Sequence, residues 1–334
     1  MKRRYFIKST AKAGIAVSFL SAYACKQGAK EKTNAKTDIA AENENKAPLF
    51  QLSLAQWSIN RMIREEGIDP YKFAEKASSW GFTGLEYVSQ LYNTELKASD
   101  YSDEAMQNFV NKNNTLAKKY GLENLLIMVD GEGALAAIDT NERKKAVEQH
   151  YKWVDAAAKM GCHSIRVNLQ GAMERESWIE ASADGLTQLA TYAKPKNINI
   201  IVENHGGPSS NGNWLASVME KVNMENCGTL PDFGNFCVKR EDGSYYASKC
   251  LVEYDIYQGV TELMPYAKAV SAKSYNFDEN GDETKIDYHR MLQIVKESGY
   301  TGYVGVEYEG DILSEEEGIL ATKNLILKAT EELA

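Results

Sequence analysis

The sequence predicts one closed (βα)8 barrel, a TIM barrel of the α/β class, over residues 48–334. Two observations predict this fold: short apolar runs alternate with longer amphipathic segments eight times, and the composition does not change along this stretch. Such alternation is typical of parallel strands joined by helical crossovers. An open doubly wound sheet would carry a glycine-rich phosphate turn after its first strand, but here that turn is QWSINRM (56–62). The closed barrel is therefore the predicted architecture.

Eight apolar runs are the strand candidates, and they span 49–57, 84–89, 123–130, 164–170, 198–204, 228–233, 267–275 and 303–309. Segments with helical periodicity lie between them, the clearest being 69–81, 103–121, 141–161 and 287–299. Asp69 and Pro70 suit the N-cap and the first turn of the first of these helices. A glycine ends each of the four just before the next strand.

The first 24 residues predict an export signal rather than a fold element. A basic start precedes a short apolar core (13–24) that ends in small residues. Arg3 and Arg4, with Phe6 and Lys8 after them, resemble the pattern of a twin-arginine signal. We therefore expect an exported bacterial protein, either periplasmic or anchored to a membrane as a lipoprotein.

Residues 25–47 predict a disordered polar tether, because they carry too few apolar side chains to bury a core. Cys25 follows Ala22-Tyr23-Ala24, which suits either cleavage after Ala24 or lipid attachment at Cys25, and we favour lipid attachment. No apolar run of 18 or more residues follows. We therefore expect contact with a membrane only through the lipid anchor.

Charge and cysteine spacing exclude some classes of protein. The net charge of −9 argues against a nucleic-acid partner, because binding a polyanion needs a basic face. The four cysteines after Cys25 follow no zinc-ligand spacing, and they are Cys162, Cys227, Cys237 and Cys250. Buried, inert thiols are the leading interpretation, and a disulfide such as Cys237 with Cys250 is left open.

Polar residues cluster where the predicted strands end, which is where TIM barrels place their active sites. They are Trp57, Glu86, Asp130, Asn168, Glu203, His205, Asp232, Lys273, Glu307 and Glu309. Several acids on one rim would repel one another unless a cation neutralises them. The pattern therefore predicts one bound divalent metal ion.

Three motifs place an acid at the ends of the fifth, sixth and eighth predicted strands. They are IIVENHGG (200–207) with Glu203, GTLPDFGNF (228–236) with Asp232, and GYVGVEYEG (302–310) with Glu307. A single rim acid is usually solvated or ion-paired, whereas three acids on one rim favour a metal site.

On these motifs, residues 50–330 resemble the sugar phosphate isomerases/epimerases with a xylose isomerase-like barrel. The resemblance implies that Glu203, Asp232 and Glu307 bind the metal. The family commonly has His-x-Lys on its seventh strand, where this chain has Ser271 and retains Lys273. His205 either supplies the missing imidazole or hydrogen-bonds the substrate without touching the metal. An oxygen-rich site favours Mn²⁺ or Mg²⁺, and an added imidazole leaves Mn²⁺, Co²⁺ or Zn²⁺ open.

The resemblance also implies proton abstraction beside a sugar carbonyl, with Glu203 and Glu307 as the acid–base pair. Lys273 either stabilises the developing oxyanion or pairs with a rim acid. The expected substrate-binding residues are Trp57, Glu86, Asn168, His205 and Lys273. Four aromatic residues either offer faces to a sugar ring or belong to the core, namely Trp57, Tyr87, Trp214 and Phe236. His150, His163 and His289 are expected to be structural or surface residues.

Two features narrow the expected partner to a small carbohydrate without a phosphate. The loop 277–287 is acidic, and an exported enzyme would meet few sugar phosphates. A metal-dependent isomerase or epimerase of a free sugar or keto-sugar is therefore the leading interpretation. A 3-keto-glycoside lyase or hydrolase using the same enolate chemistry is the first alternative. A non-catalytic, lipid-anchored sugar-binding protein is the second.

Overall fold

A computed structural model describes residues 49–333. Eight parallel strands form the central sheet: β1 (Gln51–Ala55), β2 (Gly84–Val88), β3 (Glu123–Met128), β4 (Ser164–Val167), β5 (Asn199–Glu203), β6 (Cys227–Leu230), β9 (Val270–Ser274) and β10 (Tyr303–Tyr308). Each lies within the range that the sequence predicts for it, except that β6 begins one residue earlier, at Cys227. The predicted signal peptide 1–24, the predicted tether 25–47 and the predicted lipid attachment site Cys25 lie outside the described residues.

The sheet closes on itself. Its strand order is β6-β5-β4-β3-β2-β1-β10-β9, and parallel bridges join the two outer strands through Thr229 with Ala267 and Asp232 with Ser271. The amide of Lys268 donates to the carbonyl of Thr229 at 3.0 Å across the same seam. The predicted TIM barrel is therefore confirmed.

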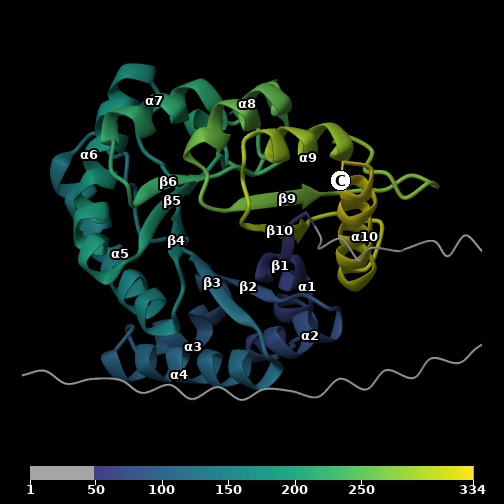
Figure 1. Ribbon diagram of the computed structural model, residues 1–334. Helices are drawn as coiled ribbons and strands as arrows, with labels where there is room; N and C mark the ends of the chain where they lie inside the picture. Colours follow the sequence, from purple (N-terminus) through teal and green to yellow (C-terminus); the bar gives the residue numbers. More distant parts are fainter. Residues whose placement is uncertain (1–48, 334) are drawn as a thin grey trace, which may run out of the picture. The chain divides into compact units, whose positions relative to one another are not determined.

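Helices surround the strands, as Figure 1 shows. They are α1 (Asn60–Arg64), α2 (Phe73–Ser79), α3 (Asn93–Ala98), α4 (Asp103–Tyr120), α5 (Thr140–Met160), α6 (Arg175–Ala193), α7 (Gly212–Val222), α8 (Ile256–Leu263), α9 (Tyr288–Glu297) and α10 (Glu315–Leu333). The side chain of Asp139 caps α5 by accepting from two backbone amides, and Gly161 ends the helix at φ 76°. The four predicted helices are confirmed as α2, α4, α5 and α9.

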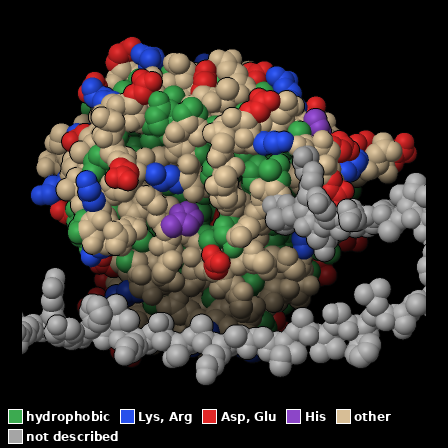
Figure 2. Space-filling view, in the orientation of Figure 1, with side chains coloured by type: hydrophobic (Ala, Val, Ile, Leu, Met, Phe, Trp, Pro, Cys, Tyr) green, Lys and Arg blue, Asp and Glu red, His purple; other side chains and the backbone are tan. Residues whose placement is uncertain are grey.

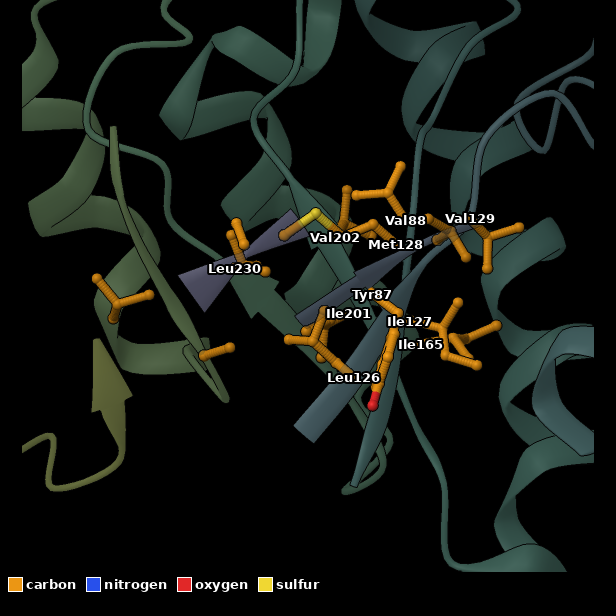
Figure 3. Packing of buried hydrophobic residues seen from close by; sticks show 14 of the residues in the cluster. Tyr87, Val88, Leu126, Ile127, Met128, Val129, Ile165, Ile201, Val202 and Leu230 are labelled. Carbon is orange, nitrogen blue, oxygen red and sulfur yellow. The ribbon is translucent and has the colours of Figure 1, made fainter. Parts of the chain in front are cut away.

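The core lies between the strands and the helices. Figure 3 shows apolar side chains of β2 to β6 packing together, among them Leu126, Ile127 and Ile165. These strands are buried on both faces, which explains why they are continuous apolar runs in the sequence. Two of the four aromatic residues proposed for sugar contact belong to this core, because Tyr87 and Phe236 are 1% and 0% exposed.

A two-stranded antiparallel hairpin, β7 (Cys237–Arg240) with β8 (Cys250–Glu253), is inserted after β6 and was not predicted. A disulfide between Cys237 and Cys250 joins its two strands, with the Cα atoms 5.8 Å apart. The disulfide that the sequence left open for this pair is therefore present. Cys162 and Cys227 are free thiols.

Acidic and basic side chains are interspersed on the face of the molecule shown in Figure 2. Among the helices of residues 49–333, none is long and apolar enough to cross a membrane.

Candidate active site

Three buried carboxylates meet at one end of the barrel, as the sequence predicts. Glu203 ends β5, Asp232 follows β6, and Glu307 lies in β10. One oxygen of each lies within 4.8 Å of the others, and the three side chains are at most 4% exposed. Buried carboxylates at this spacing need protons or cations between them.

Asp232 is held by its neighbours from several sides. The side-chain oxygen of Asn204 accepts from the Asp232 amide at 2.8 Å, and the Asn204 side-chain nitrogen donates to the Asp232 carbonyl at 2.9 Å. The carboxylate accepts from the amides of Gly234 at 2.9 Å and Asn235 at 2.8 Å. Asn204 was not among the predicted site residues, although it lies between two of them in the motif ENH.

Ser271, which stands where the family commonly has histidine, bridges two of the acids. Its hydroxyl lies 2.6 Å from Oδ2 of Asp232 and 2.9 Å from Oε2 of Glu307. A hydroxyl has one proton, so it can donate to only one of the two carboxylates at a time. The carboxylate that does not receive this proton faces the hydroxyl oxygen of Ser271 without a hydrogen between them. One more proton or a cation can occupy that position.

Lys273 brings a buried positive charge to the same cluster. Its ammonium lies 3.2 Å from Glu307, 3.1 Å from Glu309 and 3.8 Å from Asp232, and the side chain is 1% exposed. Of the two roles expected for Lys273, the structure shows the ion pair.

Arg166 of β4 provides a second buried cation that the sequence analysis missed. Its Nε lies 2.9 Å from Oε2 of Glu203, and its Nη1 donates to Oδ1 of Asp130 at 2.8 Å. The side-chain nitrogen of Asn235 donates to the other Glu203 oxygen at 2.9 Å. A charged residue inside the apolar run SIRV was the signal available in the sequence.

The surroundings shift the pKa values of the acids in opposite directions. Burial raises the pKa of Asp232 and of Glu307, although Lys273 partly opposes this and Glu203 adds to it. Burial acts in the same direction on Glu203, but the charges of His205, Arg166 and Lys273 outweigh it and lower the pKa of that carboxyl. A pair of acids with such different environments is suited to separate roles as proton donor and proton acceptor.

A cavity of about 730 Å³ opens above the cluster. Predicted residues on its wall are Trp57, Asp130, Asn168, His205, Glu307 and Glu309. Glu203, Asp232 and Lys273 do not line this cavity, whereas Arg166 and Asn235, which contact Glu203, do. Glu307 is therefore the member of the triad that faces the cavity.

The structure places Glu86 away from its expected position and distinguishes between the two interpretations of His205. Glu86 is the third of five residues in β2 rather than its end, so it lies inside the barrel at 2% exposure and accepts from the Ser53 hydroxyl at 2.6 Å. Burial raises its pKa to about 7. His205 directs Nδ1 toward Asn168, 2.9 Å away, and lies outside the group of converging ligand atoms. We therefore assign Glu86 to the interior and His205 to the cavity wall.

The donor set fits a hard divalent cation. Three carboxylates and the Ser271 hydroxyl offer only oxygen, which Mg²⁺ and Mn²⁺ prefer. The acids of the site outnumber its two buried bases, Arg166 and Lys273, since they comprise Asp130, Glu203, Asp232, Glu307 and Glu309. A divalent ion would offset this excess of negative charge.

The family of xylose isomerase-like TIM barrels matches residues 74–329, and the chain belongs to this family. A sugar phosphate isomerase/epimerase from Parabacteroides distasonis has a similar structure, with TM-score 0.62 and 14% identity over 85% of this chain and 95% of that one. A 3-keto-D-glucoside 4-epimerase from E. coli gives TM-score 0.58 and 13% identity over 77% and 94%. A barrel from Mycobacterium smegmatis, solved with magnesium, gives TM-score 0.58 and 15% identity over 85% and 98%. These likenesses show a shared fold.

Two relatives match short segments. The alpha subunit of a 3'-dehydrocarminate deglycosidase from Microbacterium sp. is 40% identical over 48 residues, which is 14% of each chain. The alpha subunit of a C-glycoside deglycosidase from Microbacterium trichothecenolyticum is 31% identical over 67 residues, 17% of this chain and 18% of that one. The matches thus span less than a fifth of either relative.

His150, on the cavity wall, makes the stability of the protein depend on pH in a way that can be tested. The side chain is 2% exposed and its Nδ1 lies 2.7 Å from the Ala146 carbonyl, and burial lowers its pKa to about 4. The unfolded chain takes up this proton near pH 6.5 but the folded protein only near pH 4, so the free energy of unfolding falls as pH drops through this window. Over the whole window His150 contributes about 3 kcal/mol of this loss.

We expect His150→Gln to lose less stability than the parent between pH 7 and pH 4.5. Urea unfolding at both pH values measures the difference. We compare the change in the free energy of unfolding between the two pH values, because the other titrating groups contribute equally to this change in both proteins. An identical loss of stability in the two proteins would contradict the lowered pKa of His150.

Proposed function

We propose that the protein is a metal-dependent isomerase or epimerase that moves a proton beside the carbonyl of a free sugar or keto-sugar. The observation that carries the proposal is the cavity of about 730 Å³, whose wall reaches a buried cluster of three carboxylates through Glu307. Family membership supports a sugar-modifying enzyme. Mn²⁺ or Mg²⁺ is the proposed metal, because the donors are oxygen atoms.

Glu307 is the proposed proton-transfer group that touches the substrate, since it lies on the cavity wall. A carboxylate takes the proton from the carbon beside the carbonyl, and the electron pair of that C–H bond forms the enediolate. The proton then returns either to the neighbouring carbon, giving an isomer, or to the opposite face, giving an epimer. Glu203 is the proposed partner in this exchange, and Arg166 and Asn235 fix its orientation.

Glu203, Asp232 and Glu307 would hold the cation, which would supply Lewis acidity to the reacting oxygen atoms. Lys273 keeps a positive charge 3.2 Å from Glu307 and so favours the ionised form of that acid. Asn168 and His205 offer polar contacts to sugar hydroxyls, and Trp57 offers a ring face.

Cleavage of a 3-keto-glycoside is the second candidate, supported by the short similarity to deglycosidase subunits. The same proton abstraction at C2 would form an enolate, whose electron pair expels the substituent at C1. A sugar-binding protein without catalysis is the remaining candidate.

Solvent deuterium exchange tests the proposal. The purified protein is incubated in D₂O with free hexoses, pentoses and 3-keto-glycosides, with Mn²⁺ or with EDTA, and the products are followed by NMR. We expect deuterium at a carbon beside the carbonyl, loss of exchange with EDTA, and recovery on adding Mn²⁺. Release of the C1 substituent would indicate the lyase instead. Sugar binding without deuterium exchange under any metal condition would indicate a sugar-binding protein without catalysis.

We also propose that the barrel acts after export, anchored by lipid at Cys25. The disulfide of the hairpin supports this, because disulfides persist in oxidising compartments. Replacing Arg3 and Arg4 by lysine keeps the charge and removes the twin-arginine pattern. We expect that variant to accumulate in the cytoplasm in cell fractionation, and its normal export would contradict the proposed signal.

A further inference from the structure

A second cavity adjoins the one above the carboxylates. It measures about 780 Å³, and Arg240 and Tyr275 line both cavities. These two side chains therefore form the partition between them. A ligand seated against Glu307 has the second cavity as its neighbour on the far side of this partition.

The partition is held in place by contacts on each side. The guanidinium of Arg240 donates to the carbonyls of Tyr245 at 2.9 Å and Ser248 at 2.5 Å, both within the hairpin loop. The ring of Tyr275 lies under the Lys285 ammonium, 4.9 Å away. A side chain at Gly234 would come within 2.7 Å of the Tyr275 hydroxyl, so a glycine is needed there for the ring to lie where it does. The wall is thus built from defined contacts.

The chemistry of the second cavity suits a ring that carries hydroxyl groups. Aromatic and aliphatic surface comes from Tyr254, Ile256 and Ile286, and the disulfide forms part of the same wall. Charged and hydrogen-bonding groups lie around it, namely Arg240, Glu253, Asp255 and Lys285. Apolar faces with polar edges are the usual match for a sugar ring or a phenol.

We propose that the second cavity is a subsite for the C1 substituent of a glycoside. Of the two proposed kinds of substrate, this selects a keto-sugar that carries a substituent at C1. The proposal rests on the proposed function, which seats the reacting sugar ring beside Glu307. The substituent then extends past Arg240 and Tyr275 into the second cavity. The inference concerns binding, and it holds whether the reaction is epimerisation or cleavage.

Two substitutions fill the subsite, and one matched substitution does not. Glu253→Trp and Ile256→Trp place an indole at residues that line the second cavity. Leu251→Trp is the control, because Leu251 is an exposed residue on the same strand as Glu253 and lines neither cavity. Glu253 is exposed, so its substitution is not expected to disturb folding. Thermal unfolding of all three variants checks this.

Calorimetry measures binding of three 3-keto-glucosides that differ at C1: methyl, phenyl, and a β-linked glucose. All variants carry Glu307→Gln, which slows turnover during the measurement. We expect Glu253→Trp and Ile256→Trp to weaken binding of the phenyl or the glucosyl compound at least 10-fold, which corresponds to about 1.4 kcal/mol. Binding of the methyl compound should weaken less than about 2-fold. Leu251→Trp should change none of them.

The pattern across ligands identifies the substituent. Loss confined to the phenyl compound indicates a phenol, and loss confined to the glucosyl compound indicates a second sugar. Equal loss for all three ligands, no loss for any, or failure of the parent to bind the larger compounds would overturn the subsite. A selective loss of binding of the larger compounds supports the subsite. If the protein without Glu307→Gln then catalyses no deuterium exchange, the proposed function is overturned but the subsite is not.

Discussion

Glu307→Gln is expected to lower the rate of proton exchange by about 10²–10⁴, the usual effect of removing a positioned acid or base. Glutamine keeps the shape of the side chain and can still accept from Ser271, which lies 2.9 Å away. It can neither take up a proton nor offer a negative oxygen to a cation. Exchange of solvent deuterium into the substrate, at saturating Mn²⁺, measures the effect.

Glu203→Gln should cause a loss of the same order, with an added loss of stability because Arg166 loses a partner 2.9 Å away. Glu331→Gln, at an exposed position of α10, is the control and should leave the rate unchanged. Full exchange activity in both the Glu307 and the Glu203 variants would disprove the proposed acid–base pair.

Arg166→Met is expected to lower the free energy of unfolding by about 3–5 kcal/mol, because it leaves buried carboxylates without their counter-charge. Arg166 is 4% exposed and pairs with both Asp130 and Glu203. Urea unfolding near neutral pH measures the change. Part of the loss should return in the double variant with Glu203→Gln, because one of the unpaired charges is then removed.

The control for Arg166 is an exposed ion pair. Lys221 lies 2.7 Å from Glu180, and the two side chains are 45% and 68% exposed. Lys221→Met should therefore cost less than about 1 kcal/mol. An equal cost for the two variants would mean that Arg166 does not stabilise the site through its buried charge.

The residues that the sequence placed correctly share a simple property. Glu203 ends its strand, Asp232 follows its strand and Glu307 is the last but one residue of its strand, and parallel strands in a barrel bring such positions together. Strand periodicity was therefore enough to predict that they meet. It was not enough for Glu86, because β2 continues for two residues beyond it and carries it into the interior.

Other features depend on partners that one sequence does not reveal. Arg166 lies within a buried strand, and its role follows only from the acids on neighbouring strands, Asp130 and Glu203. The hairpin strands β7 and β8 have four residues each and include charged side chains, so they show no apolar pattern. Their pairing is fixed instead by the disulfide between Cys237 and Cys250.

That disulfide bears on how the protein should be handled at the bench. It fastens the hairpin that supplies Arg240 to both cavities, and Cys237 and Cys250 themselves line the second. Dithiothreitol, often added to protect free thiols, would here attack the bond that shapes the ligand wall. Cys162 is buried, and burial raises the pKa of its thiol, so it needs little such protection. Purification and assay without reductant therefore keep the binding surface in the form described.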